Sequence, residues 1–282
     1  MKLKNSGAEF FIPDNTPVEE ALKRTTHMAI SAHQDDIEFM AYDGILKCFG
    51  KEDNWFYAVV VTNGAGSPRS GLYADYTDEK MQAIRKVEQK KAAYVGEYGA
   101  LSLLDYPSNA VKAKDNRDIV EELKELIAAA SPKVLYTHNL ADKHDTHIGV
   151  VCKVISAIRE LPEELRPEEV YGCEVWRNLD WVNDDEKISF DVSAHPNIGA
   201  ALNEVFDSQI TGGKRYDLAV AGRRLANATF SESHGVDTST GVLFGMDLTP
   251  LVKDVTLDVN EYVQAYISRF GDNVARRINK FF

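Results

Sequence analysis

The chain has 282 residues, of which 44% are hydrophobic and 27% are charged, a composition typical of soluble globular proteins. Its 44 acidic residues outnumber its 32 basic ones, and the net charge of −12 argues against nucleic acid or an anionic membrane as the main partner. No apolar run is long enough for a membrane span or a signal peptide, so we expect a cytoplasmic protein. Three cysteines without C-x-x-C spacing, Cys48, Cys152 and Cys173, are expected to be buried reduced thiols.

Apolar runs alternate with amphipathic stretches through the first two thirds of the chain. This pattern predicts strands at residues 26–32, 55–64, 100–108 and 133–139. Helices are expected after these strands, at residues 35–50, 78–99, 116–130 and 147–161. Such alternation predicts an α/β fold with a mostly parallel sheet flanked by helices, in which sites form at the carboxyl ends of the strands.

The pattern becomes mixed beyond about residue 165. Strands are expected at residues 168–181 and 186–194, and helices at residues 198–210, 214–230 and 260–282. No internal repeat or long linker marks a boundary. We therefore expect a single domain over residues 1–282, with a core at residues 26–165 and a mixed α/β C-terminal elaboration at residues 166–282.

Two clusters of metal-binding residue types follow the first and the fourth predicted strands. The first cluster is the tetrapeptide HQDD at residues 33–36, which opens a predicted helix. The second lies within YTHNLADKHDTHIG at residues 136–149, and its metal-binding residue types are His138, Asp142, His144, Asp145 and His147. Because the carboxyl ends of parallel strands meet at one edge of a sheet, the two clusters are expected to converge.

The chemistry of these clusters favours a catalytic zinc ion. Two imidazoles and one carboxylate form a known catalytic ligand set, which keeps a fourth position for water or substrate. A structural zinc would favour cysteine ligands, and no cysteine lies near either cluster. Adjacent aspartates fit a catalytic site, because one can bind the metal while its neighbour accepts a proton from water.

These motifs resemble those of a known family. The segment AHQDDIE resembles the A-H-P-D-D-[IV]-E signature of the PIG-L/LmbE-like zinc deacetylases, and HDTH resembles their second motif, H-P-D-H. The segments IRKVEQKKAA and LLDYPSN are also similar to segments of that family. The resemblance covers about residues 26–160, and it implies a Rossmann-like α/β fold and removal of acetyl groups from N-acetylglucosamine-type amino sugars.

The resemblance also implies roles for individual residues. It implies three zinc ligands, which are His33, Asp36 and His147. Asp35 would be the general base, and His144 would protonate the leaving amine or, as imidazolium, stabilise the oxyanion. Arg85 would contact the substrate. The same ligands suit other divalent metals, so Fe2+ is an alternative to Zn2+.

The sequence departs from the family pattern at two positions. Gln34 stands where the first motif usually has proline. In the second motif Thr146 occupies the position of the usual acid, which leaves Asp142 or Asp145 to support the histidines.

Simpler explanations exist for several of these residues. The adjacent acids at residues 35 and 36 could only complement a helix dipole, although this would not explain His33 or the second cluster. Arg85 and Glu88 could form a solvated i,i+3 pair, and His138 could be an ordinary hydrogen-bonded loop histidine.

Two further side chains in the C-terminal third, Arg177 and His234, could close the site over a substrate or simply lie on the surface. The sequence also places Trp176 and Trp181 beside Arg177, either as a platform for a sugar ring or as buried strand aromatics.

The function expected from the sequence is that of a zinc-dependent hydrolase which removes an acetyl group from an N-acetylated amino sugar or a conjugate carrying one. Two alternatives stay open: a zinc amidase acting on a non-sugar N-acyl substrate, and a metal-dependent sugar-binding protein without turnover. The acidic net charge argues against highly anionic substrates unless a local arginine cluster overrides it. A homo-oligomer is compatible with the sequence.

Overall fold

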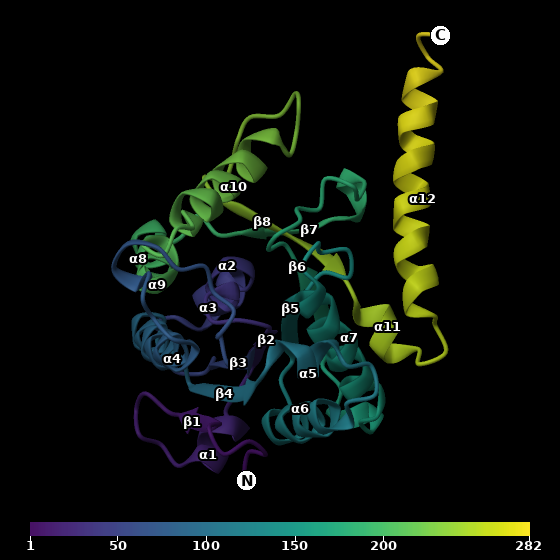
Figure 1. Ribbon diagram of the computed structural model, residues 1–282. Coiled ribbons are helices and arrows are strands. Elements are labelled where there is room, and N and C mark those ends of the chain that lie inside the picture. Colours follow the sequence, from purple (N-terminus) through teal and green to yellow (C-terminus); the bar gives the residue numbers. More distant parts are fainter.

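The centre of the fold is a sheet of β-branched and aromatic residues. The strand FYAVVVT, for example, is buried at all seven positions, as expected for a strand covered on both faces. The computed structural model describes residues 1–282, and its sheet has the strand order β1-β4-β3-β2-β5-β6-β8-β7 (Figure 1). The strands are β1 (Glu9–Phe11), β2 (His27–Ser31), β3 (Phe56–Thr62), β4 (Ala100–Tyr106), β5 (Val134–His138), β6 (Glu169–Cys173), β7 (Ile188–Asp191) and β8 (Val242–Asp247).

The five strands β4, β3, β2, β5 and β6 are parallel, whereas β1, β8 and β7 pair antiparallel at the two edges. The strands from the first two thirds of the chain and those from the C-terminal third therefore share one sheet. This arrangement confirms the predicted α/β fold with a mostly parallel sheet flanked by helices.

Helices cover both faces of the sheet, and each face has its own apolar core. One core of 39 buried residues includes side chains of α1 (Val18–Lys23), α6 (Arg117–Ala130), α7 (Asp145–Arg159) and α11 (Thr249–Lys253). The other, of 22 residues, includes side chains of α2 (Asp36–Met40), α3 (Tyr42–Cys48), α4 (Asp78–Val95) and α8 (Pro196–Glu204). The remaining helices are α5 (Ser108–Lys112), α9 (Asp207–Ile210), α10 (Tyr216–Phe230) and α12 (Val259–Ile278), with 3-10 turns at Gly71–Tyr73, Glu163–Leu165 and Asp184–Glu186.

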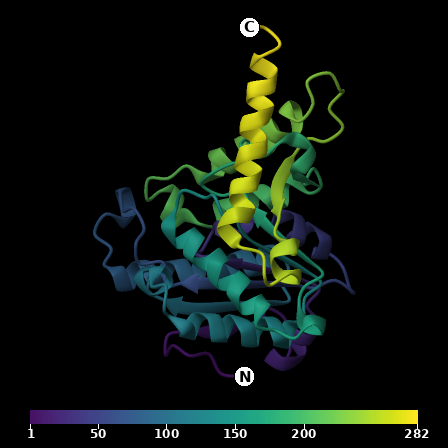
Figure 2. The ribbon, with the colours of Figure 1, turned by 90° about the vertical axis from the view of Figure 1, so that its right-hand side faces the viewer.

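The last helix, α12, buries side chains only in its first half, while Arg269 and Asn273 in the second half donate to the side chains of Glu186 and Asn183. Val263 and Tyr266 are buried, and the Tyr262 hydroxyl donates to the Asp247 carbonyl at 2.7 Å. The second half projects away from the sheet, as Figures 1 and 2 both show. None of the helices combines the length with the apolar character that crossing a bilayer requires.

Two predicted helices are divided in the structure. The helix predicted at residues 35–50 is two short helices, because the backbone leaves the helical range at Ala41 (φ −114°, ψ 24°). The helix predicted at residues 198–210 is likewise divided into α8 and α9, since Phe206 (φ −87°, ψ 56°) is not helical. Strands β1 and β8 were not predicted.

The strand predicted at residues 168–181 ends at Cys173. Beyond it, carboxylates bind the backbone N–H groups that a longer strand would have used: Glu174 accepts from Leu179 N at 2.8 Å, and Asp142 accepts from Trp176 N at 3.1 Å. The cysteines are free as expected, but Cys152 is exposed rather than buried.

Candidate metal and catalytic site

Two loops at the carboxyl edge of the sheet form the site. Strands β2 and β5 pair in parallel, so the loop after β2 and the loop after β5 emerge side by side. The first loop carries residues 33–36, and the second leads into α7, where His144 is the N-cap residue and His147 lies in the first turn. As a result, Nδ1 of His33 and Nε2 of His147 are 3.2 Å apart although 114 residues separate them in the sequence.

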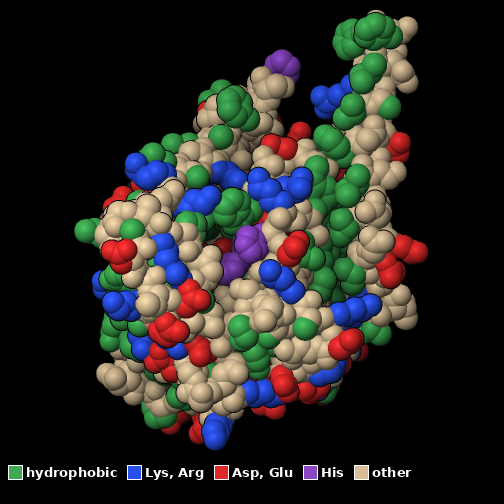
Figure 3. All heavy atoms as spheres, viewed as in Figure 1, with side chains coloured by type: hydrophobic (Ala, Val, Ile, Leu, Met, Phe, Trp, Pro, Cys, Tyr) green, Lys and Arg blue, Asp and Glu red, His purple; other side chains and the backbone are tan.

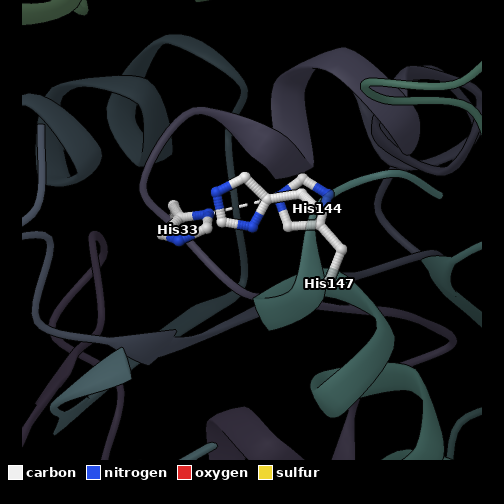
Figure 4. Close-up of side chains that lie close together, drawn as sticks. All are labelled: His33, His144 and His147. Carbon is white, nitrogen blue, oxygen red and sulfur yellow. Dashed lines mark hydrogen bonds between the residues drawn. The ribbon is translucent and has the colours of Figure 1, made fainter. Parts of the chain in front are cut away.

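Three potential ligand atoms form a nearly equilateral triangle. Oδ2 of Asp36 lies 3.1 Å from Nδ1 of His33 and 3.3 Å from Nε2 of His147, and the two nitrogens are 3.2 Å apart (the two histidines are drawn in Figure 4). Ligand atoms placed tetrahedrally at about 2.0–2.1 Å from zinc would be about 3.3–3.4 Å apart. The three side chains therefore fit a tetrahedral divalent metal with one position left open.

The ring of His147 is held in this orientation by Asp142. Oδ2 of Asp142 lies 3.3 Å from Nδ1 of His147, which leaves Nε2 to face the site. Asp142 also accepts from the backbone N–H groups of His144 and Trp176. Asp145, in contrast, is exposed. Of the two acids that could replace the missing one at Thr146, the structure therefore has Asp142 beside the histidine.

A second set of potential ligand atoms, from Asp36, His138 and His147, also lies within 4.8 Å. However, Nε2 of His138 accepts a hydrogen bond from the Ala32 N–H at 2.8 Å, so its lone pair is already used. The ring is fully buried and stacks on His147 at a centroid distance of 3.9 Å. His138 is thus a hydrogen-bonded histidine at the end of β5 that supports the neighbouring ring.

Asp35 lies beside the triangle in a strained backbone conformation. Its φ of 94° is unusual for a residue other than glycine. Gln89 holds the loop by accepting from Asp35 N at 3.2 Å, and Arg85 Nη2 lies 3.6 Å from the carboxylate. Burial raises the pKa of Asp35 well above its usual range, although Arg85 opposes this effect.

His144 presents one nitrogen to the cavity. Its Nδ1 accepts from Thr146 N at 3.3 Å, so the proton of the neutral ring is on Nε2. The ring stacks on His147 at a centroid distance of 4.6 Å and lies 4.9 Å from His33 (Figure 4). Burial lowers the pKa of His144, and the positive charges of His147 and Lys112 contribute in the same direction.

The potential ligands have opposite protonation tendencies. Burial lowers the pKa of His33 to about 4. Burial also acts to lower the pKa of His147, but Asp36 and Asp142 outweigh it and raise that pKa to about 9. Against the effect of burial, His147 and His33 hold the pKa of Asp36 well below its usual range. A metal binding to these atoms would therefore displace a proton from His147.

Arg85 is buried and fixes the loop that carries Asp35. Its guanidinium donates to the Gln34 carbonyl and to Ser67 Oγ, both at 2.6 Å. The side chain also lines the cavity in front of the site. Glu88 accepts from Ser208 N and Oγ instead of pairing with Arg85. The alternative of a solvated pair on the surface of this helix is therefore wrong.

Gln34, at the position of the usual proline, is also part of this framework. Its side chain is buried and donates to the Thr62 carbonyl at 3.0 Å. Gly64, with φ 76°, allows the close approach, since a Cβ atom there would lie 2.4 Å from Gln34 Oε1. A side-chain hydrogen bond thus restrains the turn that a proline ring would otherwise stiffen.

A cavity of about 560 Å³ opens in front of these residues, and Figure 3 shows histidine at the bottom of the hollow. Ten of its 22 lining residues lie beyond residue 165. Among them the sequence offers Trp176 as a candidate, and Arg223, next to Arg224, more readily as part of an amphipathic interface or solvated face than as an anion site. The others include Glu174, Lys214 and Tyr216. Their sequences are those of ordinary amphipathic segments, so no motif marked them. Arg177 and His234 are exposed and do not line the cavity.

Comparison with known proteins shows which family and which solved structures this chain resembles. Residues 28–158 match the family described as PIG-L, GlcNAc-PI de-N-acetylase. No curated protein sequence matches the chain.

Three similar solved structures illustrate the range of chemistry on this fold. The first is GalB, the 4-carboxy-2-hydroxymuconate hydratase from Pseudomonas putida KT2440, with 18% identity and a TM-score of 0.60 over 83% of this chain and 99% of that one. The second is the N,N'-diacetylchitobiose deacetylase from Pyrococcus horikoshii, with 14% identity and a TM-score of 0.63 over 84% and 88%. The third is a zinc-inhibited form of the teicoplanin deacetylase Orf2, with 12% identity and a TM-score of 0.54 over 79% and 98%. At these identities the likeness shows the fold alone.

Proposed function

Because this chain carries a PIG-L-family domain over residues 28–158, we propose that it is a metal-dependent hydrolase that removes the acetyl group from an N-acetylated amino sugar or a conjugate of one. The observation that carries the proposal is the triangle of ligand atoms from His33, Asp36 and His147, with Asp35 beside it. The names of two similar structures, an N,N'-diacetylchitobiose deacetylase and a teicoplanin deacetylase, support the same type of reaction.

Zinc (Zn2+) or another divalent cation such as Fe2+ suits this nitrogen and oxygen ligand set. When bound, the metal would supply Lewis-acid polarisation of the amide carbonyl and make water a stronger nucleophile. Asp35 and Asp36 at the floor of the cavity are buried, which strengthens their electrostatic effects.

The protein's own residues then divide the proton transfers. Asp35 accepts a proton from the attacking water, whose oxygen forms a bond to the carbonyl carbon. Arg85 keeps the Asp35 loop in place through the Gln34 carbonyl. His144 directs Nε2–H into the cavity, where it donates a hydrogen bond to the developing oxyanion. As the C–N bond breaks, Asp35 passes the proton that it took from water to the leaving nitrogen. The products are acetate and the free amine.

A second candidate reaction is the addition of water to a carbon–carbon double bond. It is favoured by the structural similarity to a hydratase, because the match extends over 99% of the hydratase chain. A base such as Asp35 and an acid such as His144 would serve that reaction as well. An assay for this protein therefore needs to detect both acetate and the loss of a conjugated double bond.

The test measures acetate release from N-acetylated amino sugars and N-acetyl amino acids, and loss of conjugated absorbance from unsaturated acids. The protein is stripped with a chelator and reloaded with zinc, and Asp35→Asn is measured beside Asp145→Asn, a matched control on an exposed acid. We expect acetate from the sugars only with metal, and a decrease in kcat of at least roughly 10²-fold in Asp35→Asn alone.

Other outcomes have distinct meanings. Acetate from N-acetyl amino acids but not from sugars would support the non-sugar amidase. Loss of the conjugated absorbance without acetate would support the hydratase. Tight metal and sugar binding without any turnover would leave a binding protein, and undiminished turnover in Asp35→Asn would remove that residue from the role of base.

A further inference from the structure

The wall of the cavity carries cations that have no carboxylate partner. Lys112 at the end of α5, Lys214 before α10 and Arg223 within α10 all line the cavity. None of the three lies within 4.0 Å of a carboxylate oxygen, whereas the buried Arg85 on the same wall has Asp35 at 3.6 Å. Figure 3 shows Lys and Arg side chains on several sides of the hollow that contains the histidines.

Of the acids in the cavity, only Glu174 interacts with one of these cations: burial raises the pKa of Glu174, and the positive charge of Arg223 opposes this rise. Arg223 also donates to the Val175 carbonyl, which leaves Lys112 and Lys214 as the uncompensated cations. Asp36 is directed at the histidines of the metal site, and Asp35 faces Arg85. The carboxylate of Glu174 accepts from Leu179 N at 2.8 Å, from the Asn227 side chain at 2.9 Å and from Phe244 N at 3.4 Å. The outer wall is therefore positive, in a chain whose net charge is −12.

Trp176 connects this positive wall to the reactive groups. Its ring has Lys214 Nζ 4.9 Å and Lys143 Nζ 6.0 Å from its centroid, which is cation–π distance. The same ring lies 6.3 Å from that of His144, and its backbone N–H is bound by Asp142. The Lys214 ammonium is thus within about 11 Å of the His144 imidazole, as the two ring distances together require.

We infer that the wall of the cavity selects a substrate bearing an anionic group, phosphate or carboxylate, which Lys112 and Lys214 bind while Trp176 contacts the adjoining ring. The local cations reverse the preference for uncharged substrates that the net charge alone suggests, because ion pairing acts at short range. The inference rests on the proposed function only for the acetylated sugar, since the anion site itself does not depend on the reaction.

The test compares substrates that share one acetamide and differ in charge. N-acetylglucosamine 1-phosphate and N-acetylmuramic acid carry a phosphate and a carboxylate, and methyl N-acetylglucosaminide is neutral. At about 2–5-fold for each exposed ion pair, we expect the anionic sugars to exceed the neutral one roughly tenfold in kcat/KM. Lys112→Ala and Lys214→Ala together should remove most of this preference, while Lys253→Ala, on the remote helix α11, should not.

A binding measurement makes failure of the inference distinguishable from failure of the proposed function. N-acetylglucosamine 1-phosphate is titrated into metal-loaded Asp35→Asn protein, followed by tryptophan fluorescence, with an added Trp176→Phe substitution as the control for the signal. Binding that Lys214→Gln weakens supports the anion site even when no sugar releases acetate. Equal acetate release from charged and neutral sugars would overturn the anion site and keep the deacetylase. Absence of both binding and acetate would overturn both.

Discussion

The two parts of the chain that meet at the cavity contribute side chains of different character. The part before residue 165 supplies Asp36, His147 and Asp142, all nearly inaccessible and tied to one another by short polar contacts. The C-terminal third supplies half-buried residues such as Trp176 and Lys214, which face the cavity with part of their surface free.

We therefore expect the buried residues of the first part to serve the chemical step and the half-buried residues of the C-terminal third to recognise the substrate. The atoms that we propose as metal ligands would need to keep their positions to within about 0.5 Å, and they lie just after the central strand β2 and in the first turn of α7. The wall can change without disturbing them, because it comes from α10, β8 and the loop after β6. One fold can thereby serve several reactions and substrates.

The largest effect is expected from breaking the metal site. Asp36→Ala should remove one corner of the ligand triangle, so that metal content and activity both decrease to background. Metal per chain is measured after dialysis, and Asp145→Ala serves as the control because this acid is exposed on the same helix as His147. Wild-type metal content in Asp36→Ala would exclude Asp36 as a ligand.

A smaller effect is expected from the residue that orients a ligand. Asp142→Ala should lower metal affinity by about 10–100-fold, since the His147 ring loses its partner at Nδ1. Competition with a fluorescent zinc chelator measures this affinity. An unchanged affinity would mean that packing against His138 is sufficient to hold the ring.

The contact between the two parts of the chain, made by Ser208 with Glu88, is tested by Ser208→Ala. Ser208 Oγ donates to the buried Glu88 carboxylate at 2.6 Å, and hydrogen bonds to charged groups are worth about 1.5–3 kcal/mol. Because the Ser208 N–H still donates to Glu88, we expect the free energy of unfolding to decrease by about 1–2 kcal/mol. Urea unfolding measures this change, with the exposed Ser233→Ala as the control. A stability equal to that of wild type would show that this contact depends on packing alone.

The smallest effect is expected at Arg177, which the sequence offered as a residue that closes the site. Its side chain is exposed and does not line the cavity, so Arg177→Ala should change stability by less than about 0.5 kcal/mol and leave kcat/KM near wild type. Steady-state kinetics with the best substrate measures this. A large increase in KM would mean that the loop after β6 moves toward the cavity when substrate binds.

The sequence predicted the residues of the candidate metal site better than those that line the cavity beyond residue 165. His33, Asp36 and His147 could be grouped from the sequence because parallel strands place their carboxyl ends at one edge, and a short motif follows each strand. The same reasoning could not decide between Asp142 and Asp145, because that choice depends on how the loop turns before α7.

Most of the residues that line the cavity beyond residue 165 were not predicted, for a different reason. Tyr216 and Arg223 belong to an amphipathic helix whose pattern predicts burial on one side but not which cavity that side meets. The early end of β6 was also unpredictable, because the carboxylates that bind the following N–H groups belong to Glu174 and to the distant Asp142. Long-range contacts of this kind leave no periodic signal in the chain.

Because β8 lies between β6 and β7 in the sheet but comes late in the chain, the sheet and the cavity wall can be completed only after residues 242–247 have been synthesised. His147 emerges from the ribosome well before Leu243, the cavity-lining residue of β8. The interval of about 100 residues lasts about 5–20 s at ordinary rates of translation. Once β6 (Glu169–Cys173) has emerged and until β8 follows, β6 presents an unpaired strand edge, which is an opportunity for misassembly. The nascent chain thus exposes the proposed metal ligands before the wall of the cavity is complete.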